Sequence, residues 1–360
     1  MTEKKKYRIG VIGAGMIART HIRNLLKTGR AEVTWIAARN PDNLERVRAE
    51  FAIPHKSQRY HDILEDPEVD LVVITTPPHL HREMFIEAVR ASKHVLLEKP
   101  MTLNREEIGE MVRVKKQHPE TLAMECSGRH ARLIPKYRKV KEIIDSGELG
   151  EIYYIHHNSV FRQNRPGIEF HPRAKWFLDT SQAGGGPLFD WGVYDLSFHL
   201  GILGDTHELV EVESALLKSG LDEVNPETDI YDVEEHFVVN MWLSGGVKYF
   251  WERGAHANME VPNETRIYGT RGGIRLGYCS WDDPVITVYG LDHENKATRE
   301  QITLDYSEQD DGLELTRHVI RVLDGEDNPV ITMDQAQKNM EMIFRCYEAA
   351  RQSSRAKCQQ

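Results

Sequence analysis

Cysteine is scarce in this chain, with four residues in 360, and no two of them form a CxxC pair. The spacing therefore excludes the disulfide framework of small secreted domains and gives no sign of a thiolate zinc site. A protein with so few and such scattered thiols is typical of a reducing compartment. We expect a cytoplasmic location.

Long apolar runs are also missing. A membrane helix needs about 18 consecutive apolar residues, whereas the longest candidates here are short stretches such as 71–74 and 95–97. Lysines at 4–6 precede the first apolar segment, as in a signal peptide, but glycines interrupt that segment and Arg19 and His21 follow closely. We expect a buried first strand instead, and no membrane partner.

Positive charge is not in excess. Lys and Arg number 46 against 56 Asp and Glu, so the formal net charge is −10, with both signs spread along the chain. This balance argues against nucleic acid or an anionic lipid surface as the main partner. The 40% hydrophobic and 28% charged residues are typical of a soluble globular protein. At about 150 residues per domain, the length predicts two domains.

The N-terminal third alternates β-branched runs with amphipathic stretches, which predicts βαβ units on a parallel sheet. Strands are expected at 7–12, 33–37, 69–74, 94–97 and 122–126. Asn40 followed by Pro41 predicts the start of a helix over 41–51, and Asn104 with Glu107 has capping-box spacing before a helix to 116. We expect residues 1–126 to form a Rossmann dinucleotide-binding domain.

The pattern changes near Gly150. A helix at 135–146 comes first, and alternating runs at 152–161, 231–242, 247–251, 265–268 and 285–289 then indicate a mostly antiparallel sheet. Further helices are expected at 188–203, 311–323 and 334–351. Residues 127–360 are thus predicted to form a second α/β domain, whose C-terminal helix can pack back on the first. With no long linker, we expect the two halves to build a site between them.

Directly after the first strand comes a GxGxxA pattern. Gly13 permits a tight turn, Gly15 lets the backbone approach a pyrophosphate, and Ala18 lets the following helix pack closely. Met16 and Ile17 open that helix, whose N-terminal N–H groups attract an anion. The pattern favours a dinucleotide site over a glycine-rich turn without a ligand.

The second strand lacks the acidic residue that would bind the ribose 2′-hydroxyl of NAD. Ala38 stands near that position and Arg39 follows it. A guanidinium accommodates a 2′-phosphate, so NADP(H) is favoured over NAD(H). Two alternatives stay open: Arg39 stacks on the adenine of either cofactor, or it is a surface arginine at a strand end.

The fourth and fifth strands end in further candidates. Thr76 and Pro77 begin a loop at the ligand-binding edge, and His81 either touches a cofactor ribose or caps local backbone. Glu98 and Lys99 precede a proline that can adopt a cis bond. Lys99 could stabilise alkoxide character during hydride transfer, the alternative being a solvated surface lysine.

In the second half, Asp190 and Tyr194 are four residues apart, which on one helix makes them neighbours. A phenol has a pKa of about 10 and needs a nearby cation, such as Lys99, to act as a base. The alternative is a core aromatic with an aspartate that satisfies backbone donors. No histidine pair has a third ligand at useful spacing, so no metal is expected.

Together these residues resemble the glucose-fructose oxidoreductase and inositol dehydrogenase family of NAD(P)-dependent sugar oxidoreductases, over nearly the whole chain. The resemblance rests on GAGMIA at 13–18, TPPHLH at 76–81, HVLLEKP at 94–100, SGELGEI at 146–152 and GGGPLFDWGVYD at 184–195. It implies a C-terminal domain whose open sheet mediates a homodimer or homotetramer. It also implies that Lys99 and Asp190 are catalytic, with Tyr194 as the acid/base where many members have histidine. Tyrosine is associated with branches that frequently use NADP(H).

The expected sites follow from the motifs and the resemblance. The cofactor is expected at Gly13, Gly15, Met16, Ile17, Arg39, Thr76, Pro77, His81, Glu98, Lys99 and Trp176. A sugar or polyol substrate is expected at Lys99, Arg129, His157, Arg165, Asp190 and Tyr194, with Arg162 and Asp179 as further pocket candidates. The alternatives are a redox-neutral NAD-dependent glycosidase and a non-catalytic cofactor-binding regulator. The several arginines could bind an acidic substrate group or pair with acidic neighbours.

Overall fold

The computed structural model describes residues 5–162, 175–221 and 230–358. The chain divides into two compact units, each described here by itself. The first contains residues 1–129 and 310–338, and the second contains 130–309 and 339–360. The C-terminal part of the chain thus contributes to both units.

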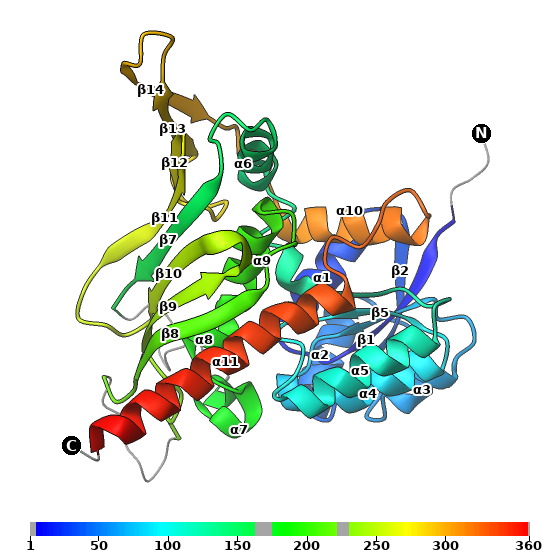
Figure 1. The fold of residues 1–360 in the computed structure, drawn as a ribbon. Helices are drawn as coiled ribbons and strands as arrows, with labels where there is room; N and C mark the ends of the chain where they lie inside the picture. Colours follow the sequence, from blue (N-terminus) through cyan, green and yellow to red (C-terminus); the bar gives the residue numbers. More distant parts are fainter. Residues whose placement is uncertain (1–4, 163–174, 222–229, 359–360) are drawn as a thin grey trace. The chain divides into compact units, whose positions relative to one another are not determined.

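The first unit is built on a six-stranded sheet of order β3-β2-β1-β4-β5-β6, in which every pair is parallel. Strands β1, β2 and β5 of this sheet are labelled in Figure 1. Its strands are β1 (Tyr7–Ile12), β2 (Ala31–Ala37), β3 (His55–Ser57), β4 (Leu71–Ile74), β5 (His94–Leu97) and β6 (Ala123–Glu125). The strand order reverses between β1 and β4, which is where open parallel sheets bind ligands. This arrangement confirms the expected Rossmann fold.

The helices of the first unit begin largely where the sequence predicts. They are α1 (Met16–Lys27), α2 (Pro41–Glu50), α3 (His61–Glu65), η1 (Pro78–Leu80), α4 (His81–Arg90), α5 (Arg105–Gln117), η2 (Cys126–Gly128) and α10 (Asp311–Leu323). Asn40 caps α2 and Asn104 caps α5, each accepting from the backbone N–H three residues later. The capping box of α5 is modified, because the Glu107 carboxylate accepts from Leu103 N and from the Thr102 hydroxyl.

The second unit contains an eight-stranded sheet of order β14-β13-β12-β11-β7-β10-β9-β8. Its strands are β7 (Ile152–Val160), β8 (Leu209–Lys218), β9 (His236–Leu243), β10 (Val247–Gly254), β11 (Val261–Gly269), β12 (Gly273–Leu276), β13 (Val285–Leu291) and β14 (Ala297–Thr303). The sheet is mostly antiparallel, as predicted, with one parallel pair between β7 and β10. The strand predicted at 231–242 begins only at His236.

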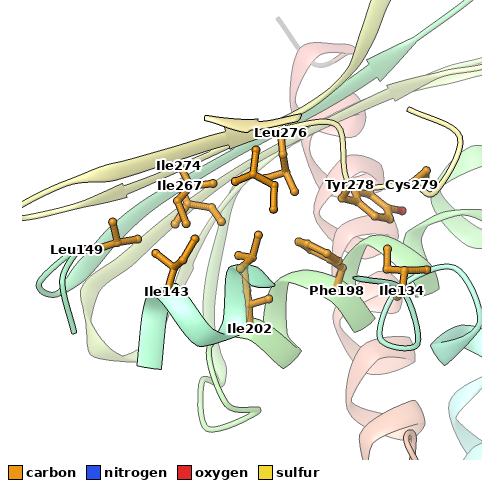
Figure 2. Packing of buried hydrophobic residues seen from close by; sticks show 13 residues of the cluster. Ile134, Ile143, Leu149, Phe198, Ile202, Ile267, Ile274, Leu276, Tyr278 and Cys279 are labelled. Atoms are coloured by element: carbon orange, nitrogen blue, oxygen red, sulfur yellow. The ribbon is translucent and has the colours of Figure 1, made fainter. Parts of the chain in front are cut away.

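Apolar side chains from helices and strands join in the core of this unit. Its helices are α6 (Pro135–Asp145), η3 (Lys175–Leu178), α7 (Thr180–Ala183), α8 (Pro187–Asp190), α9 (Gly192–Ile202), η4 (Ser244–Gly246) and α11 (Met333–Cys358), the last of which begins in the first unit. Figure 2 shows Ile143 of α6 and Phe198 and Ile202 of α9 packed beneath Ile267 and Ile274 of the sheet. Burying this apolar surface fixes α9 against the sheet.

The helix predicted over 188–203 is interrupted, which corrects one step of the sequence argument. Helix α8 ends at Asp190 and α9 begins at Gly192, with Trp191 between them at φ −99° and ψ −28°. The Tyr194 N–H donates to Trp191 O at 2.9 Å instead of to Asp190 O. Asp190 and Tyr194 therefore do not share the regular i, i+4 geometry of one helix. Within the described ranges, no helix is long and apolar enough to cross a membrane.

Candidate active site

The turn after β1 has the geometry that a bound pyrophosphate requires. Gly13 has φ +111°, and a Cβ there would lie 2.4 Å from Thr75 Oγ1, so only glycine fits. Gly15 is the N-cap of α1, and among the described residues outside its immediate chain neighbours none places an atom within 4 Å of where a Cβ would lie. The first turn of α1 has no acidic residue and no side-chain cap. Its N–H groups thus suit a phosphate group.

Arg39 follows β2 and is exposed. Its backbone oxygen accepts from the Gln58 side chain at 3.1 Å. Among the residues that the structure describes, none forms a hydrogen bond or ion pair with the Arg39 guanidinium. The guanidinium can therefore approach a ligand at this strand end without first breaking an ion pair.

The loop after β4 is held by His81, whose expected contact with the cofactor does not fit its position. The imidazole is fully buried. Its Nε2 lies 2.7 Å from Thr76 O, and its Nδ1 lies 3.1 Å from Pro100 O. Burial lowers the pKa of His81, which favours the neutral ring. A neutral ring has one N–H and donates to only one of these two carbonyls. His81 therefore packs between the loop after β5 and the Thr76–Pro77 loop, whose two side chains are half-buried.

Lys99 stands at the end of β5 beside a buried cluster centred on Glu98. One Glu98 oxygen lies 2.7 Å from His21 Nε2 and accepts from Arg129 Nη1 at 2.6 Å, while the other accepts from Lys99 N at 3.1 Å. Burial alone would raise the pKa of Glu98, but Arg129 and His21 hold it well below its usual value. The cluster fixes the backbone of Lys99, whose bond to Pro100 is cis.

This cluster adds a supporting role to those predicted for Glu98 and Arg129. Glu98 and Arg129 are each less than a tenth exposed and are paired with one another. The contacts expected of Glu98 with a cofactor and of Arg129 with a substrate stay predictions, since a guanidinium has five N–H donors and can keep this pairing while it donates to a ligand. Both side chains act here as supports for Lys99.

The same cluster raises the question of a metal. His21, Glu98 and Cys126 bring one ligand atom each to within 4.8 Å of one another. However, the Glu98 oxygen that faces His21 already accepts from the Arg129 guanidinium, and burial raises the pKa of the Cys126 thiol well above its usual value. A protonated thiol is a poor metal ligand. We interpret the group as a hydrogen-bond cluster.

The buried Glu125 at the end of β6 should make the stability of the protein depend on pH. Burial raises its pKa to about 7, although it accepts from Ser127 N at 2.7 Å. Because the unfolded chain releases this proton near pH 4.5, the free energy of unfolding should fall as pH rises from about 4.5 to about 7. Glu125→Gln should therefore raise the free energy of unfolding, relative to the wild type, by more at pH 8 than at pH 5, as measured by urea unfolding.

The exposed Glu308 offers a matched control. Glu308→Gln should change the free energy of unfolding by a similar, small amount at both pH values. If Glu125→Gln also changes the free energy of unfolding by the same amount at pH 5 and pH 8, the pKa of Glu125 is not raised in the folded protein.

In the second unit, the side chains of Asp190 and Tyr194 are both buried. Asp190 is the last residue of α8, and Tyr194 lies in the first turn of α9. The start of α8 is capped by Glu234, whose carboxylate accepts from Gly186 N at 2.8 Å and from Leu188 N at 2.9 Å. A negative charge at a helix N-terminus is stabilising. Glu234 therefore anchors the segment that carries Asp190.

Asp195, which the sequence analysis did not single out, anchors α9. Its fully buried carboxylate accepts from Arg253 Nη2 at 2.6 Å, from Trp251 Nε1 at 2.8 Å and from Tyr278 OH at 2.5 Å. Burial alone would raise the pKa of Asp195, but Arg253 holds it well below its usual value. All residues of α9 are buried, and a buried carboxylate requires hydrogen-bond partners. An aspartate within this helix was therefore the sequence signal that could have identified Asp195.

His157 does not fit its predicted role in substrate binding. It has no exposed surface, its Nδ1 lies 2.9 Å from Thr265 Oγ1, and its Nε2 lies 3.2 Å from Arg253 Nη2. Burial lowers its pKa. His157 thus belongs to the network around Asp195.

The other pocket candidates lie at the ends of the segment that follows β7. Trp176 is half-buried and stacks on Phe177 with ring centroids 3.9 Å apart. Arg162 is exposed, and Asp179 caps α7 by accepting from Ser181 N at 2.9 Å. Arg165 lies outside the described residues.

Comparisons with known proteins agree with this organisation. Residues 7–126 match the family model described as an oxidoreductase family with an NAD-binding Rossmann fold, and 137–275 match the GFO/IDH/MocA C-terminal domain. Myo-inositol 2-dehydrogenase of Thermotoga maritima is 26% identical over 74% of this chain and 74% of its own. D-xylose 1-dehydrogenase [NADP(+)] of Haloarcula marismortui is 25% identical over 95% of this chain and 87% of its own.

Among solved structures, a levoglucosan dehydrogenase in complex with NADH and levoglucosan is similar in fold. Its TM-score is 0.83 at 20% identity, and the match covers 97% of this chain and 98% of that one.

Proposed function

Since the chain belongs to the GFO/IDH/MocA family of NAD(P)-dependent sugar oxidoreductases, we propose that it transfers hydride between C4 of a nicotinamide and a secondary alcohol or ketone of a sugar, inositol or related polyol. The observation that carries the proposal is the buried Glu98 cluster, which fixes Lys99 at the carboxyl edge of the dinucleotide-binding sheet. The names of the relatives, an inositol and a xylose dehydrogenase, support the substrate class.

The residues of the chain have distinct roles in this proposal. The bound nicotinamide accepts or supplies the hydride. The Lys99 ammonium donates a hydrogen bond to the substrate oxygen and stabilises its alkoxide character. Tyr194 takes up or returns the hydroxyl proton, and Asp190 orients the substrate hydroxyl or the lysine.

A panel of polyols tests the function directly. The purified protein is mixed with NADP⁺ or NAD⁺ and with cyclic and open-chain polyols, and absorbance is followed at the band of the reduced nicotinamide. At least one polyol should reduce the cofactor. If the protein binds the cofactor tightly but reduces none with any polyol, the proposed activity is wrong.

Preference for NADP(H) is the second part of the proposal, and Arg39 carries it. Removal of a guanidinium that pairs with a 2′-phosphate should raise the Kd of NADPH by about 10-fold or more, since charge-assisted hydrogen bonds are worth about 1.5–3 kcal/mol. Arg39→Ala should change the Kd of NADH by less than about 3-fold. Fluorescence titration with both reduced cofactors measures the two constants.

Arg46, exposed on α2, supplies the matched control because it carries the same charge. Arg46→Ala should leave the ratio of the two constants unchanged. An unchanged ratio in Arg39→Ala as well would mean that Arg39 does not select the cofactor.

Homodimers or homotetramers are proposed to form through the sheet of the second unit, as the family resemblance implies. Large apolar side chains exposed on its strands support this: Tyr153, Val210, Leu216 and Leu291. Light scattering coupled to size exclusion measures the assembly.

A further inference from the structure

Four aromatic rings of the second unit, Tyr194 among them, form a closed cluster. The Tyr194 ring lies 5.1 Å from His130 and 5.4 Å from Trp191, centroid to centroid. Trp281 closes the cluster, at 5.1 Å from His130 and 5.9 Å from Trp191. These separations are those of favourable aromatic pairs. The residue proposed to move the proton therefore packs against two of these rings, and Trp281 contacts both of them.

Trp281 differs from the rest of the cluster in its exposure. It is 59% exposed, whereas Tyr194 is 2% exposed. The Arg253 guanidinium lies 4.8 Å from the centroid of the Trp191 ring and covers that ring. Among the described rings of the cluster, Trp281 therefore offers the largest apolar surface to a ligand.

The loop that carries Trp281 is firmly held, so its exposure does not result from a loose segment. The fully buried Lys136 ammonium donates to Cys279 O at 2.6 Å and to Asp282 O at 3.3 Å. The Asp282 carboxylate accepts from Cys279 N at 2.9 Å. Burying an ammonium is costly unless its partners are in place. This loop thus presents an exposed indole in a fixed position.

From this geometry we infer that Trp281 is a substrate-stacking residue that selects ring-closed polyols, either pyranoses or cyclitols. The inference rests on the proposed function and deepens it. A ring-closed polyol presents a face of C–H groups that packs flat on an indole, while its hydroxyl groups project around the edge. An open-chain polyol has no such fixed apolar face. Trp281 should therefore contribute to the KM of cyclic substrates far more than to that of linear ones.

Steady-state kinetics of two variants test the inference. Trp281→Ala should lower kcat/KM for myo-inositol or 1,5-anhydroglucitol by about 5- to 10-fold, mainly through KM. It should change kcat/KM for sorbitol or xylitol by less than about 2-fold. Trp281→Phe, which keeps an aromatic face, should recover most of the loss. An equal loss for cyclic and linear substrates would overturn the inference.

Trp242 on β9 supplies a matched control, because its ring contacts Glu213 and Lys248 and, among the described residues, pairs with no ring of this cluster. Trp242→Ala should leave the ratio of cyclic to linear kcat/KM unchanged. Thermal unfolding of each variant separates a loss of substrate contact from a loss of folded protein.

A binding measurement separates failure of this inference from failure of the proposed function. If the wild type oxidises no polyol, the proposed function fails, and quenching of tryptophan fluorescence by myo-inositol then decides the inference. Saturable quenching that is present in the wild type and in Trp242→Ala but lost in Trp281→Ala supports it. Quenching that persists in Trp281→Ala, or that is absent from the wild type, overturns it.

Discussion

Replacing Tyr194 with phenylalanine is expected to lower kcat by about 10²- to 10⁴-fold, the usual contribution of a positioned general acid or base. The change removes only the hydroxyl, and the ring can keep its packing against His130 and Trp191. The Kd of the cofactor and the thermal unfolding temperature should therefore change little. Stopped-flow and steady-state assays, with a parallel fluorescence titration of the cofactor, give all of these quantities.

Lys99→Ala should reduce turnover to a similar extent, again with little change in cofactor affinity. If both residues act on one proton transfer, the double variant should be about as slow as the slower single variant, because residues that act as a unit are not additive. The exposed Lys56 offers a control, and Lys56→Ala should keep wild-type turnover. Equal losses of turnover and of cofactor affinity in Lys99→Ala and Tyr194→Phe would contradict the roles assigned here.

Arg253→Met is expected to lower the free energy of unfolding by about 3–5 kcal/mol, the usual cost of leaving a buried charge without its partner. The Asp195 carboxylate is fully buried and accepts two hydrogen bonds from Arg253. Without the guanidinium, that carboxylate must either stay charged with no cation to pair with it or take up a proton. Urea unfolding at neutral pH measures the loss.

The Asp195–Arg253 pair also predicts how the free energy of unfolding changes with pH. The pKa of Asp195 in the folded protein lies well below the usual value of 3.8, so its stabilising contribution is present above pH 3.8 and is lost as pH falls below it. In Arg253→Met the pKa of Asp195 should rise, and the gap to the wild type should narrow between pH 7 and pH 4. Arg253→Met combined with Asp195→Asn should be more stable than Arg253→Met alone. A gap that is constant with pH would mean that Asp195 does not depend on Arg253.

The first unit could be predicted from sequence in most respects, because its signals are local. Strands β1 and β5 and helix α10 match the expected bounds, and Asn40 and Asn104 are the predicted caps. A buried parallel strand is a continuous apolar run, and a capped helix has its signal within four residues. Strand β3 escaped prediction because it has only three residues, none of them buried.

The candidate site was harder to predict, because its supports come from distant parts of the chain. Glu98 and Arg129 were expected to meet ligands, yet they pair with each other across 31 residues of sequence. Asp195 and Arg253 are 58 residues apart, and no local sequence pattern at either position predicts that they pair. The close approach at Gly192 is also long-range, since a Cβ there would lie 2.8 Å from the Trp251 ring. Pairings of this kind follow from the fold and not from residue spacing.

The fate of deuterium from a labelled polyol tests the central claim most directly. A polyol that reduces the cofactor is prepared with deuterium on its carbinol carbons, and the reduced cofactor is isolated and examined by mass spectrometry and NMR. Hydride transfer from carbon predicts one deuterium at nicotinamide C4 of the released cofactor. Reduced cofactor without deuterium at C4 would contradict the account.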